Sequence, residues 1–214
     1  MIEKKLRILI ADDHALVRAG IKTILADEVD IELIGEADSA TQALKRVRSE
    51  NWDIVIMDIN MPGQNSLDVL RLIKLEKPEL PVLILTMHPE NHYALRALKD
   101  GASGYLTKSG APDDLVSAIH KIVNGGAYVS PALALQLAGQ LRSKPRETLH
   151  ELLSDREFTV LCAVASGKPL SQIATELNLS AKTISSYRTR VLSKLGMHSN
   201  SELVRYALEH HLIQ

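Results

Sequence analysis

The sequence is poor in cysteine, in aromatic residues and in long apolar runs. Cys162 is the only cysteine, which excludes a framework of internal disulfides. No apolar run approaches the roughly 20 residues that span a bilayer, and no charged-then-apolar leader follows Met1, so we expect a cytoplasmic protein with no membrane partner. Aromatic residues make up 3% of the chain, so aliphatic side chains must build its cores, which suits helices packed on a small parallel sheet.

The net charge of -1 shows no excess of either sign, but the charges are unevenly distributed. Acidic residues mark the ends of predicted strands in the first half. Basic residues gather near the end of the chain, at Lys182, Arg188, Arg190 and Lys194. A neutral total therefore does not exclude binding to nucleic acid.

The first half alternates short apolar runs with segments of helical spacing, which is a (βα)5 pattern. It predicts an α/β domain with a doubly wound parallel sheet and helices on both faces. The predicted strands cover residues 6–10, 31–35, 54–57, 82–85 and 104–106. The predicted helices cover residues 14–26, 39–49, 66–76, 89–99 and 112–124.

The last third of the chain predicts a small all-α domain of four helices. Ser154 and Ser180 are suited to cap helices that run to residues 165 and 195, and the other two helices cover 170–177 and 201–210. Glycine and proline residues around an apolar patch predict a linker with one short helix between the domains. The predicted organisation is a first domain at 1–126, a linker at 127–150 and a second domain at 151–214.

Five polar side chains follow the predicted strands of the first domain. They are Asp12 and Asp13 after the first strand, Asp58 after the third, Thr86 at the end of the fourth and Lys108 beyond the fifth. In a doubly wound sheet these positions meet at one edge. Three crowded carboxylates call for a divalent cation, and an all-oxygen site suits Mg²⁺. Screened by Mg²⁺ and Lys108, the Asp58 carboxylate can attack a phosphoryl group, whose oxygens Thr86 and Lys108 would hold.

A simpler interpretation is that these acids only cap the helices that follow them, as aspartate often does. For Asp12 or Asp58 taken singly, capping is the better interpretation. The combination with Thr86 and Lys108 in the right strand order favours the phosphoryl site.

Four segments of the first half resemble the receiver domain of response regulators. They read ILIADDH, IVIMDINMPG, LILTMH and GASGYLTK. The resemblance implies that Asp58 accepts a phosphoryl group from the phosphohistidine of a sensor histidine kinase. It also implies that Mg²⁺ is held by Asp13, Asp58 and the backbone carbonyl of Asn60, with Asp12 assisting through water.

The resemblance further implies a switch pair, Thr86 and Tyr105. On phosphorylation Thr86 is expected to move toward the phosphoryl group and Tyr105 to turn inward. The alternative for Tyr105 is an ordinary half-buried aromatic with its hydroxyl in water. One position departs from the family pattern: Ser66 stands where the family usually has glycine, so the backbone there lacks a left-handed turn or keeps one at the cost of strain.

The C-terminal segment contains a short helix, a turn and then a helix rich in cations. Charge alone is more typical of a solvated helix face. The order LSDREFTVL, IATELNLSAKTISSYRTRVLSKLG and ELVRYALEHHLI, however, resembles the LuxR-type helix-turn-helix of the NarL/FixJ family. The resemblance implies a recognition helix at about 181–195, supported by the helix at 170–177.

The predicted recognition helix divides into three groups of residues. Those expected at the base edges of the major groove are Lys182, Ser185, Ser186, Thr189 and Arg190. Those expected at phosphates are Thr183, Tyr187, Arg188 and Lys194. Those expected to face the core are Ile184, Val191, Leu192 and Leu195.

These features predict a two-component response regulator in which phosphorylation of Asp58 controls sequence-specific DNA binding and transcription. We expect a homodimer when the protein is active, because one small domain contacts only a half-site. We expect no enzyme activity beyond slow self-dephosphorylation. Two alternatives stay open from the sequence: a phosphatase that forms an aspartyl phosphate, and a constitutive DNA-binding protein whose receiver serves only for dimerisation.

Overall fold

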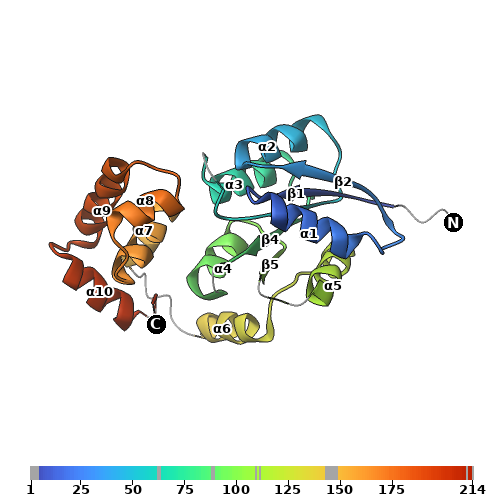
Figure 1. Cartoon of the computed structure of the whole chain (residues 1–214). Helices are drawn as coiled ribbons and strands as arrows, with labels where there is room; N and C mark the ends of the chain where they lie inside the picture. Colours follow the sequence, from blue (N-terminus) through green and yellow to red (C-terminus); the bar gives the residue numbers. More distant parts are fainter. Residues whose placement is uncertain are drawn as a thin grey trace. The chain divides into compact units, whose positions relative to one another are not determined.

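The computed structural model describes residues 5–61, 64–87, 90–108, 110, 112–142, 149–210 and 212–213. The chain divides into two compact units, Met1–Gly139 and Gln140–Gln214. The first unit is built on a five-stranded parallel sheet, and the second is helical (Figure 1). The division lies within the segment 127–150 that the sequence predicts as a linker, and residues 127–139 are grouped with the first unit. Residues 143–148 of that segment lie outside the described residues.

The first unit confirms the predicted doubly wound α/β fold. Its strands pair in the order β2-β1-β3-β4-β5, all parallel. They are β1 (Leu6–Ala11), β2 (Ile31–Ala37), β3 (Ile54–Met57), β4 (Val82–Thr86) and β5 (Gly104–Thr107). The helices between and after them are α1 (Ala15–Leu25), α2 (Ala40–Ser49), α3 (Ser66–Glu76), α4 (Glu90–Lys99) and α5 (Pro112–Val123). The start predicted for the fourth helix, Pro89, lies outside the described residues.

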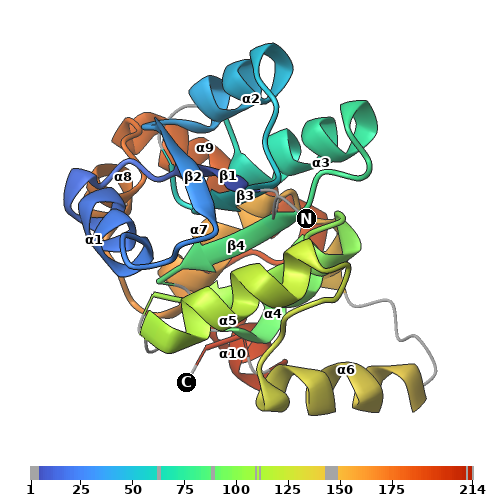
Figure 2. The ribbon, with the colours of Figure 1, turned by 90° about the vertical axis from the view of Figure 1, so that its right-hand side faces the viewer.

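Helices cover both faces of this sheet. In Figure 1, α1 and α2 lie on opposite sides of β1 and β2, and Figure 2 shows α1 and α5 on the same face. On that face Ile8, Ile56 and Leu83 belong to a buried cluster with Ile21 of α1 and Ile119 of α5. Successive strand residues point to opposite faces, and Leu9, Val55 and Ile84, which point to the other face, are buried as well. Burial on both faces explains why β3 is a continuous apolar run, whereas the edge strand β2 contains Glu32 and Glu36.

The chain after α5 adds a short pairing to the edge of the sheet. Tyr128 forms an isolated parallel bridge with Gly104, its carbonyl accepts the N–H of Tyr105 at 3.0 Å, and its N–H donates to Ser103 at 3.1 Å. A Cβ at Gly104 would lie 2.8 Å from the Tyr128 carbonyl oxygen, so the close approach requires glycine. The predicted linker helix follows as α6 (Pro131–Arg142).

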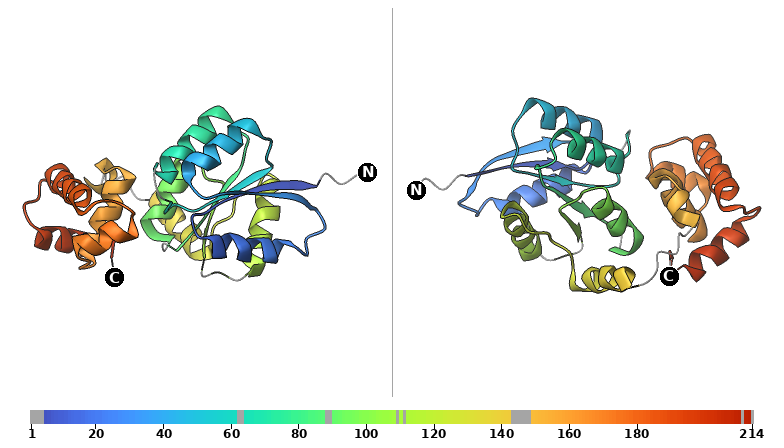
Figure 3. Two further views of the ribbon diagram at one scale, coloured as in Figure 1. Left: turned by 45° about the horizontal axis from the view of Figure 1, so that its top comes forward. Right: turned by 180° about the vertical axis from the view of Figure 1, so that it is seen from behind.

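The second unit confirms the predicted four-helix domain. A short 3₁₀ helix, η1 (Leu149–Leu152), precedes α7 (Asp155–Ala165), α8 (Leu170–Glu176), α9 (Ala181–Leu195) and α10 (Asn200–Glu209). These helices, coloured orange to red, pack into a bundle in both views of Figure 3. Phe158, Ile184 and Leu203 are fully buried and come from three different helices.

Local capping explains where the helices of the second unit begin. Ser154 and Glu157 form a reciprocal capping box at α7, and the side chains of Ser180 and Ser199 accept backbone N–H groups at α9 and α10. Gly196, with φ of 66°, ends α9 in the left-handed conformation. Within the described residues, no helix combines the length and the apolar character required to cross a membrane.

Candidate functional site

The carboxyl edge of the sheet brings together the acidic residues predicted to share a site. Asp12 follows β1 and Asp58 follows β3, and these two strands are neighbours in register, with Ala11 beside Met57. Asp12 and Asp58 are almost fully buried, and the Asp13 side chain is 20% exposed. Asp12, Asp13, His14 and Asp58 each offer one potential ligand atom, and these atoms lie within 4.8 Å of one another.

Lys108 links the two buried carboxylates. Its Nζ lies 2.6 Å from Oδ2 of Asp12 and 2.6 Å from Oδ2 of Asp58. Burial by itself disfavours the charged ammonium, but the hydrogen bonds and charges of the two carboxylates outweigh burial and raise the pKa of Lys108 above its ordinary value. Lys108 is therefore a permanent cation between Asp12 and Asp58.

The backbone fixes the other oxygen of each buried carboxylate. The N–H of His14 donates to Oδ1 of Asp12 at 2.8 Å, and the N–H of Asn60 donates to Oδ1 of Asp58 at 3.2 Å. Each carboxylate thus receives a backbone donor on one oxygen and Lys108 on the other. The turns after β1 and β3 hold both side chains in one orientation.

Negative charge is in excess at this edge. Asp12 and Asp58 contact the ammonium of Lys108. Asp13 adds a third carboxylate to the group, and His14 adds a ring nitrogen. Such a donor set, with more acid than base, fits a hard divalent cation. The arrangement can therefore hold a metal ion beside Asp58.

His14 is a residue that sequence reasoning missed. Its Nδ1 lies 3.3 Å from Oδ1 of Asp12 and 2.9 Å from Oδ1 of Asp13, while most of its side chain is exposed. The only sequence signal was its position directly after the two acids. His14 adds a titratable group at the exposed rim of the site.

Thr86 and Tyr105 lie on the two strands beyond β3. Thr86 ends β4 and is fully buried, and its carbonyl accepts the N–H of Lys108 at 2.8 Å. Tyr105 lies in β5 beside Ile84 and is also fully buried. The alternative of a half-buried Tyr105 with its hydroxyl in water is therefore wrong for this structure.

Ser66 adopts ordinary helical geometry. Asn65 caps α3 by accepting the N–H of Leu67, and Ser66 is the first helical residue. Among the described residues Asn178 is the only one other than glycine with a positive φ, so Ser66 needs neither a left-handed turn nor backbone strain. Its buried hydroxyl has no hydrogen-bond partner among the described residues.

In the second unit, α8 and α9 are joined by the turn that a helix-turn-helix requires. Asn178 takes a left-handed conformation with φ of 51°, and Ser180 then caps α9. Ile184, Val191 and Leu195 are buried at helical spacing as expected, whereas Leu192 is only partly buried. The residues predicted to face the major groove are all exposed: Lys182, Ser185, Ser186, Thr189 and Arg190.

The residues predicted to contact phosphates make contacts with other side chains of the second unit. Thr183 bonds to the capping hydroxyl of Ser180, and the Nε of Arg188 donates to Asn200 at 2.5 Å. The Arg190 guanidinium lies 5.6 Å from the centre of the Tyr187 ring, within the range of a cation–π contact.

Lys194 is the most strongly engaged of this group. Its Nζ donates to Oε2 of Glu157 at 2.6 Å and lies 3.3 Å from the carbonyl oxygen of Leu152. Glu157 is buried and also accepts the N–H of Ser154. The ammonium of Lys194 is thus held by an internal acid.

Two sequence families match this chain. The family described as "Response regulator receiver domain" matches residues 8–120, and the family described as "Bacterial regulatory proteins, luxR family" matches residues 151–207. The chain is a two-component response regulator. Its receiver unit carries the acidic site, and its LuxR-type DNA-binding unit carries α8 and α9.

Curated relatives and solved structures resemble this response regulator over nearly its whole length. Response regulator UvrY of Escherichia coli K12 is 38% identical over 208 residues, which are 97% of this chain and 95% of that protein. Response regulator GacA of Pseudomonas aeruginosa is 34% identical over 209 residues, covering 97% and 98%. RcsB of Salmonella enterica serovar Typhimurium, solved bound to promoter rprA with the phosphomimetic BeF₃⁻, is 29% identical with a TM-score of 0.62, covering 94% of this chain and 98% of RcsB.

Proposed function

We propose that a sensor histidine kinase phosphorylates Asp58 and that this phosphorylation controls DNA binding by α9. The observation that carries the proposal is the 2.6 Å contact of Lys108 with both Asp58 and Asp12. With one oxygen held by the Asn60 N–H and the other by Lys108, the Asp58 carboxylate is oriented and its charge is screened. An Asp58 oxygen forms the bond to phosphorus as the phosphorus–nitrogen bond of the kinase phosphohistidine breaks, and the electron pair of that bond returns to the histidine.

Mg²⁺ is the cofactor that this donor set favours. Asp13, Asp58 and the backbone carbonyl of Asn60 would hold it, with Asp12 acting through water. When bound, the ion supplies positive charge for the phosphoryl oxygens. Thr86 and Lys108 would contact the same oxygens, since both lie at the carboxyl edge of the sheet.

The response begins at the switch pair in this proposal. Thr86 ends β4, and Tyr105 lies on the adjacent strand, both without solvent exposure. A phosphoryl group adds about -1.5 to -2 charges, which would repel DNA at an interface. An increase in DNA binding on phosphorylation must therefore pass through a rearrangement of these buried side chains and of the surface beside α4 and β5.

The chain acts as a phosphoryl acceptor and not as an enzyme in this proposal. Asp58 retains the phosphoryl group until slow self-dephosphorylation removes it. A phosphatase would instead turn over a simple phosphate ester, and measured turnover of such an ester by the whole chain would contradict this assignment.

The DNA-binding surface is the exposed side of α9. We assign base-edge contacts to Lys182, Ser185, Ser186, Thr189 and Arg190, which are all exposed. Phosphate contacts fall to Thr183, Tyr187 and Arg188, because the Nε bond of Arg188 to Asn200 leaves its other N–H groups to donate. The sequence predicts a phosphate contact for Lys194 as well. Its ammonium is paired with Glu157, so we assign Lys194 to stabilising the domain and not to binding phosphate.

The partners follow from the two units. A receiver implies a histidine kinase, and the DNA-binding unit implies double-stranded DNA with two half-sites bound by a homodimer. By similarity, the structures of RcsB bound to promoter rprA and of two RcsB dimers bound to two parallel DNAs support DNA binding by a dimer. A protein that regulates transcription in this way is expected in the cytoplasm, where the chromosome lies.

Asp53 provides a matched control for testing Asp58, because the two aspartates stand at opposite ends of β3. We would incubate the full chain with a small phosphodonor and Mg²⁺ and locate the label by mass spectrometry. Asp58→Asn should abolish labelling, and Asp53→Asn should retain it, since the carbonyl oxygen of the substituted amide can still accept the Arg7 N–H. Undiminished labelling of Asp58→Asn would refute the assignment, and labelling that persists in EDTA would remove the metal from the proposal.

A second experiment tests control of DNA binding. Phosphorylated full chain would select its site from random DNA, and binding would be compared with and without phosphorylation. If the receiver masks α9, the isolated fragment 147–214 should bind at least as well as the unphosphorylated chain; if it drives dimerisation, the fragment should bind weakly. Unchanged affinity and oligomeric state on phosphorylation would contradict the proposal, and a normal response of Thr86→Ala would remove Thr86 from the switch.

A further inference from the structure

A second cluster of metal-ligating side chains lies at the amino edge of the sheet, opposite the phosphorylation site. Glu28 and Asp30 belong to the connection between α1 and β2, and His120 lies in the last turn of α5. The His120 Nε2 lies 3.6 Å from Oε2 of Glu28, and its Nδ1 lies 3.7 Å from Oδ2 of Asp30. One ligand atom from each of the three residues lies within 4.8 Å of the other two.

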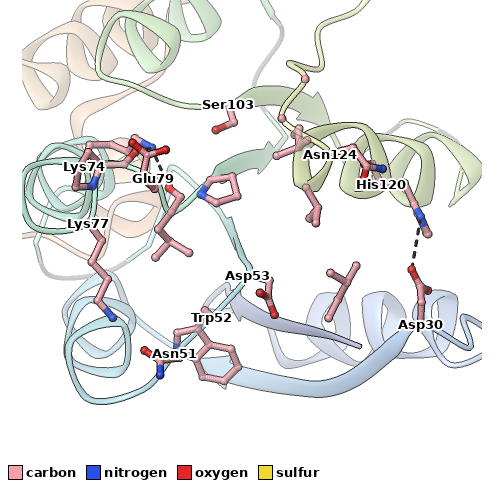
Figure 4. A pocket seen from close by; sticks show the side chains of 18 of the residues that line it. Asp30, Asn51, Trp52, Asp53, Lys74, Lys77, Glu79, Ser103, His120 and Asn124 are labelled. Carbon is pink, nitrogen blue, oxygen red and sulfur yellow. Dashed lines mark hydrogen bonds and ion pairs between the residues drawn. The ribbon is translucent and has the colours of Figure 1, made fainter. Parts of the chain in front are cut away.

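The cluster lies on the wall of a broad, open pocket of about 1390 Å³. Figure 4 shows His120 from α5 pointing toward Asp30, with Trp52 and Asp53 also lining the pocket. The three side chains are 30 to 39% exposed. A small ion can therefore reach the cluster from solvent and keep water on its free positions.

The distances from the His120 nitrogens to the carboxylate oxygens are too long for direct hydrogen bonds. They are close to the distance between two ligand atoms of one metal ion. Nitrogen–oxygen hydrogen bonds span about 2.7–3.2 Å, whereas the two contacts measure 3.6 and 3.7 Å. Zinc–nitrogen and zinc–oxygen bonds of about 2.1 Å place two ligands of a tetrahedral ion about 3.4 Å apart. One ion binds only one ring nitrogen of His120, so one of the two measured pairs is a ligand pair, and a shift of a few tenths of an ångström would bring it to that spacing. The third ligand atom, within 4.8 Å of the other two, would move farther, which side chains that are partly exposed permit.

The cations that line the same pocket do not neutralise the cluster. Lys74 donates its Nζ to the carbonyl oxygens of Pro78 and Leu80 at 2.6 and 2.9 Å. Lys77 donates its Nζ to the carbonyl oxygen of Glu50 at 3.1 Å. The two carboxylates thus face one imidazole, and a divalent cation would balance their charge.

We propose that Glu28, Asp30 and His120 bind a divalent transition metal, with Zn²⁺ as the occupant. One ring nitrogen of His120 and one oxygen from each carboxylate would ligate the ion, and water would complete its shell. The imidazole of His120 among the ligands favours Zn²⁺ over Mg²⁺. The ion would tie the end of α5 to the α1–β2 connection and so stabilise the receiver unit. This proposal does not depend on phosphorylation of Asp58.

The test uses the full chain in excess Mg²⁺, which competes with Zn²⁺ for the carboxylates of the carboxyl edge. Zn²⁺ would be titrated calorimetrically, and the side-chain nitrogens of the histidines would be followed by NMR. We expect a shift of the His120 ring nitrogen that binds Zn²⁺, and one Zn²⁺ fewer per chain in His120→Gln than in the parent chain. Loss of an outer-shell partner at a metal site weakens metal affinity by roughly 10- to 100-fold. His120→Gln and Glu28→Gln each remove a ligand, so each should weaken Zn²⁺ affinity by at least that factor.

His198→Gln is the matched control, because His198 is exposed on the second unit and should leave Zn²⁺ binding unchanged. Both test variants must retain Asp58 phosphorylation, which shows that the receiver is folded. Equal Zn²⁺ affinity in the parent, His120→Gln and Glu28→Gln would overturn the proposal. So would His120 resonances that respond to pH but not to Zn²⁺, because the cluster would then be an ion-pair group only.

Discussion

The ion pair between Lys194 and Glu157 gives the sharpest stability prediction for the DNA-binding unit. Replacing Lys194 with methionine keeps the aliphatic stem and a good helix former but removes the ammonium. Glu157 would remain buried with only the hydrogen bonds of Ser154 to stabilise its charge. The α7–α9 contact would then hold a buried carboxylate without its cation.

The magnitude follows from the burial of the two partners. Hydrogen bonds to charged groups contribute about 1.5–3 kcal/mol, but the Lys194 side chain is 42% exposed, and solvent screens its charge. We therefore expect Lys194→Met to lower the free energy of unfolding by about 1–2 kcal/mol. In a unit of this size that corresponds to a Tm lower by roughly 5–15 °C.

Lys182→Met is the matched control, because Lys182 is exposed near the start of the same helix. It should change the free energy of unfolding by no more than about 0.5 kcal/mol, while lowering the affinity for the selected DNA site more than the affinity for random DNA, as loss of a base-edge contact does. Calorimetry of the full chain would measure the first quantity, and titrations with both kinds of DNA at several salt concentrations the second. A Glu157→Gln, Lys194→Met double-mutant cycle would isolate the pair energy.

The opposite pattern would refute the reasoning. If Lys194→Met left the Tm unchanged and reduced the salt slope by one, Lys194 would be a phosphate contact, as the sequence predicted, and the ion pair would contribute nothing to stability.

Two further predictions concern pH and packing. Burial by itself raises the pKa of Glu157, but the hydrogen bonds of Lys194 and Ser154 outweigh it and hold the pKa below its usual range. The resulting contribution to the free energy of unfolding should be present above about pH 4.3 and be lost as the pH falls through the folded-state pKa. An acid titration of Glu157→Gln should lack this loss. Gly35→Ala should destabilise the receiver unit by about 1–3 kcal/mol, because its Cβ would lie 2.2 Å from the buried Trp52 ring. In α1, a Cβ added at Gly20 would have no atom within 4 Å, so Gly20→Ala should stabilise the receiver unit by about 0.5–1 kcal/mol. Denaturation followed by Trp52 fluorescence measures the stability of both variants, and equal effects would contradict the packing argument.

Short-range signals in the sequence determined the elements and their order. The apolar runs predicted all five strands, and Ser154 and Ser180 predicted the starts of α7 and α9, because capping depends on residues three positions apart. Parallel pairing then placed Asp12 and Asp58 at one edge, since the carboxyl ends of neighbouring strands meet there. The fold and the location of the acidic site could therefore be predicted without coordinates.

Only the tertiary structure decided which side chains become partners. The sequence predicted Lys108 beside Asp58, but it did not predict the partners of Lys194, which lies 37 residues from Glu157, or of His120, which lies some 90 residues from Glu28 and Asp30. Sequence spacing does not determine such pairs, because a long side chain has several rotamers and packing selects among them. For this reason the sequence predicted that α9 carries cations, while the structure distinguished Lys182 from Lys194, whose ammonium is paired with the buried carboxylate of Glu157.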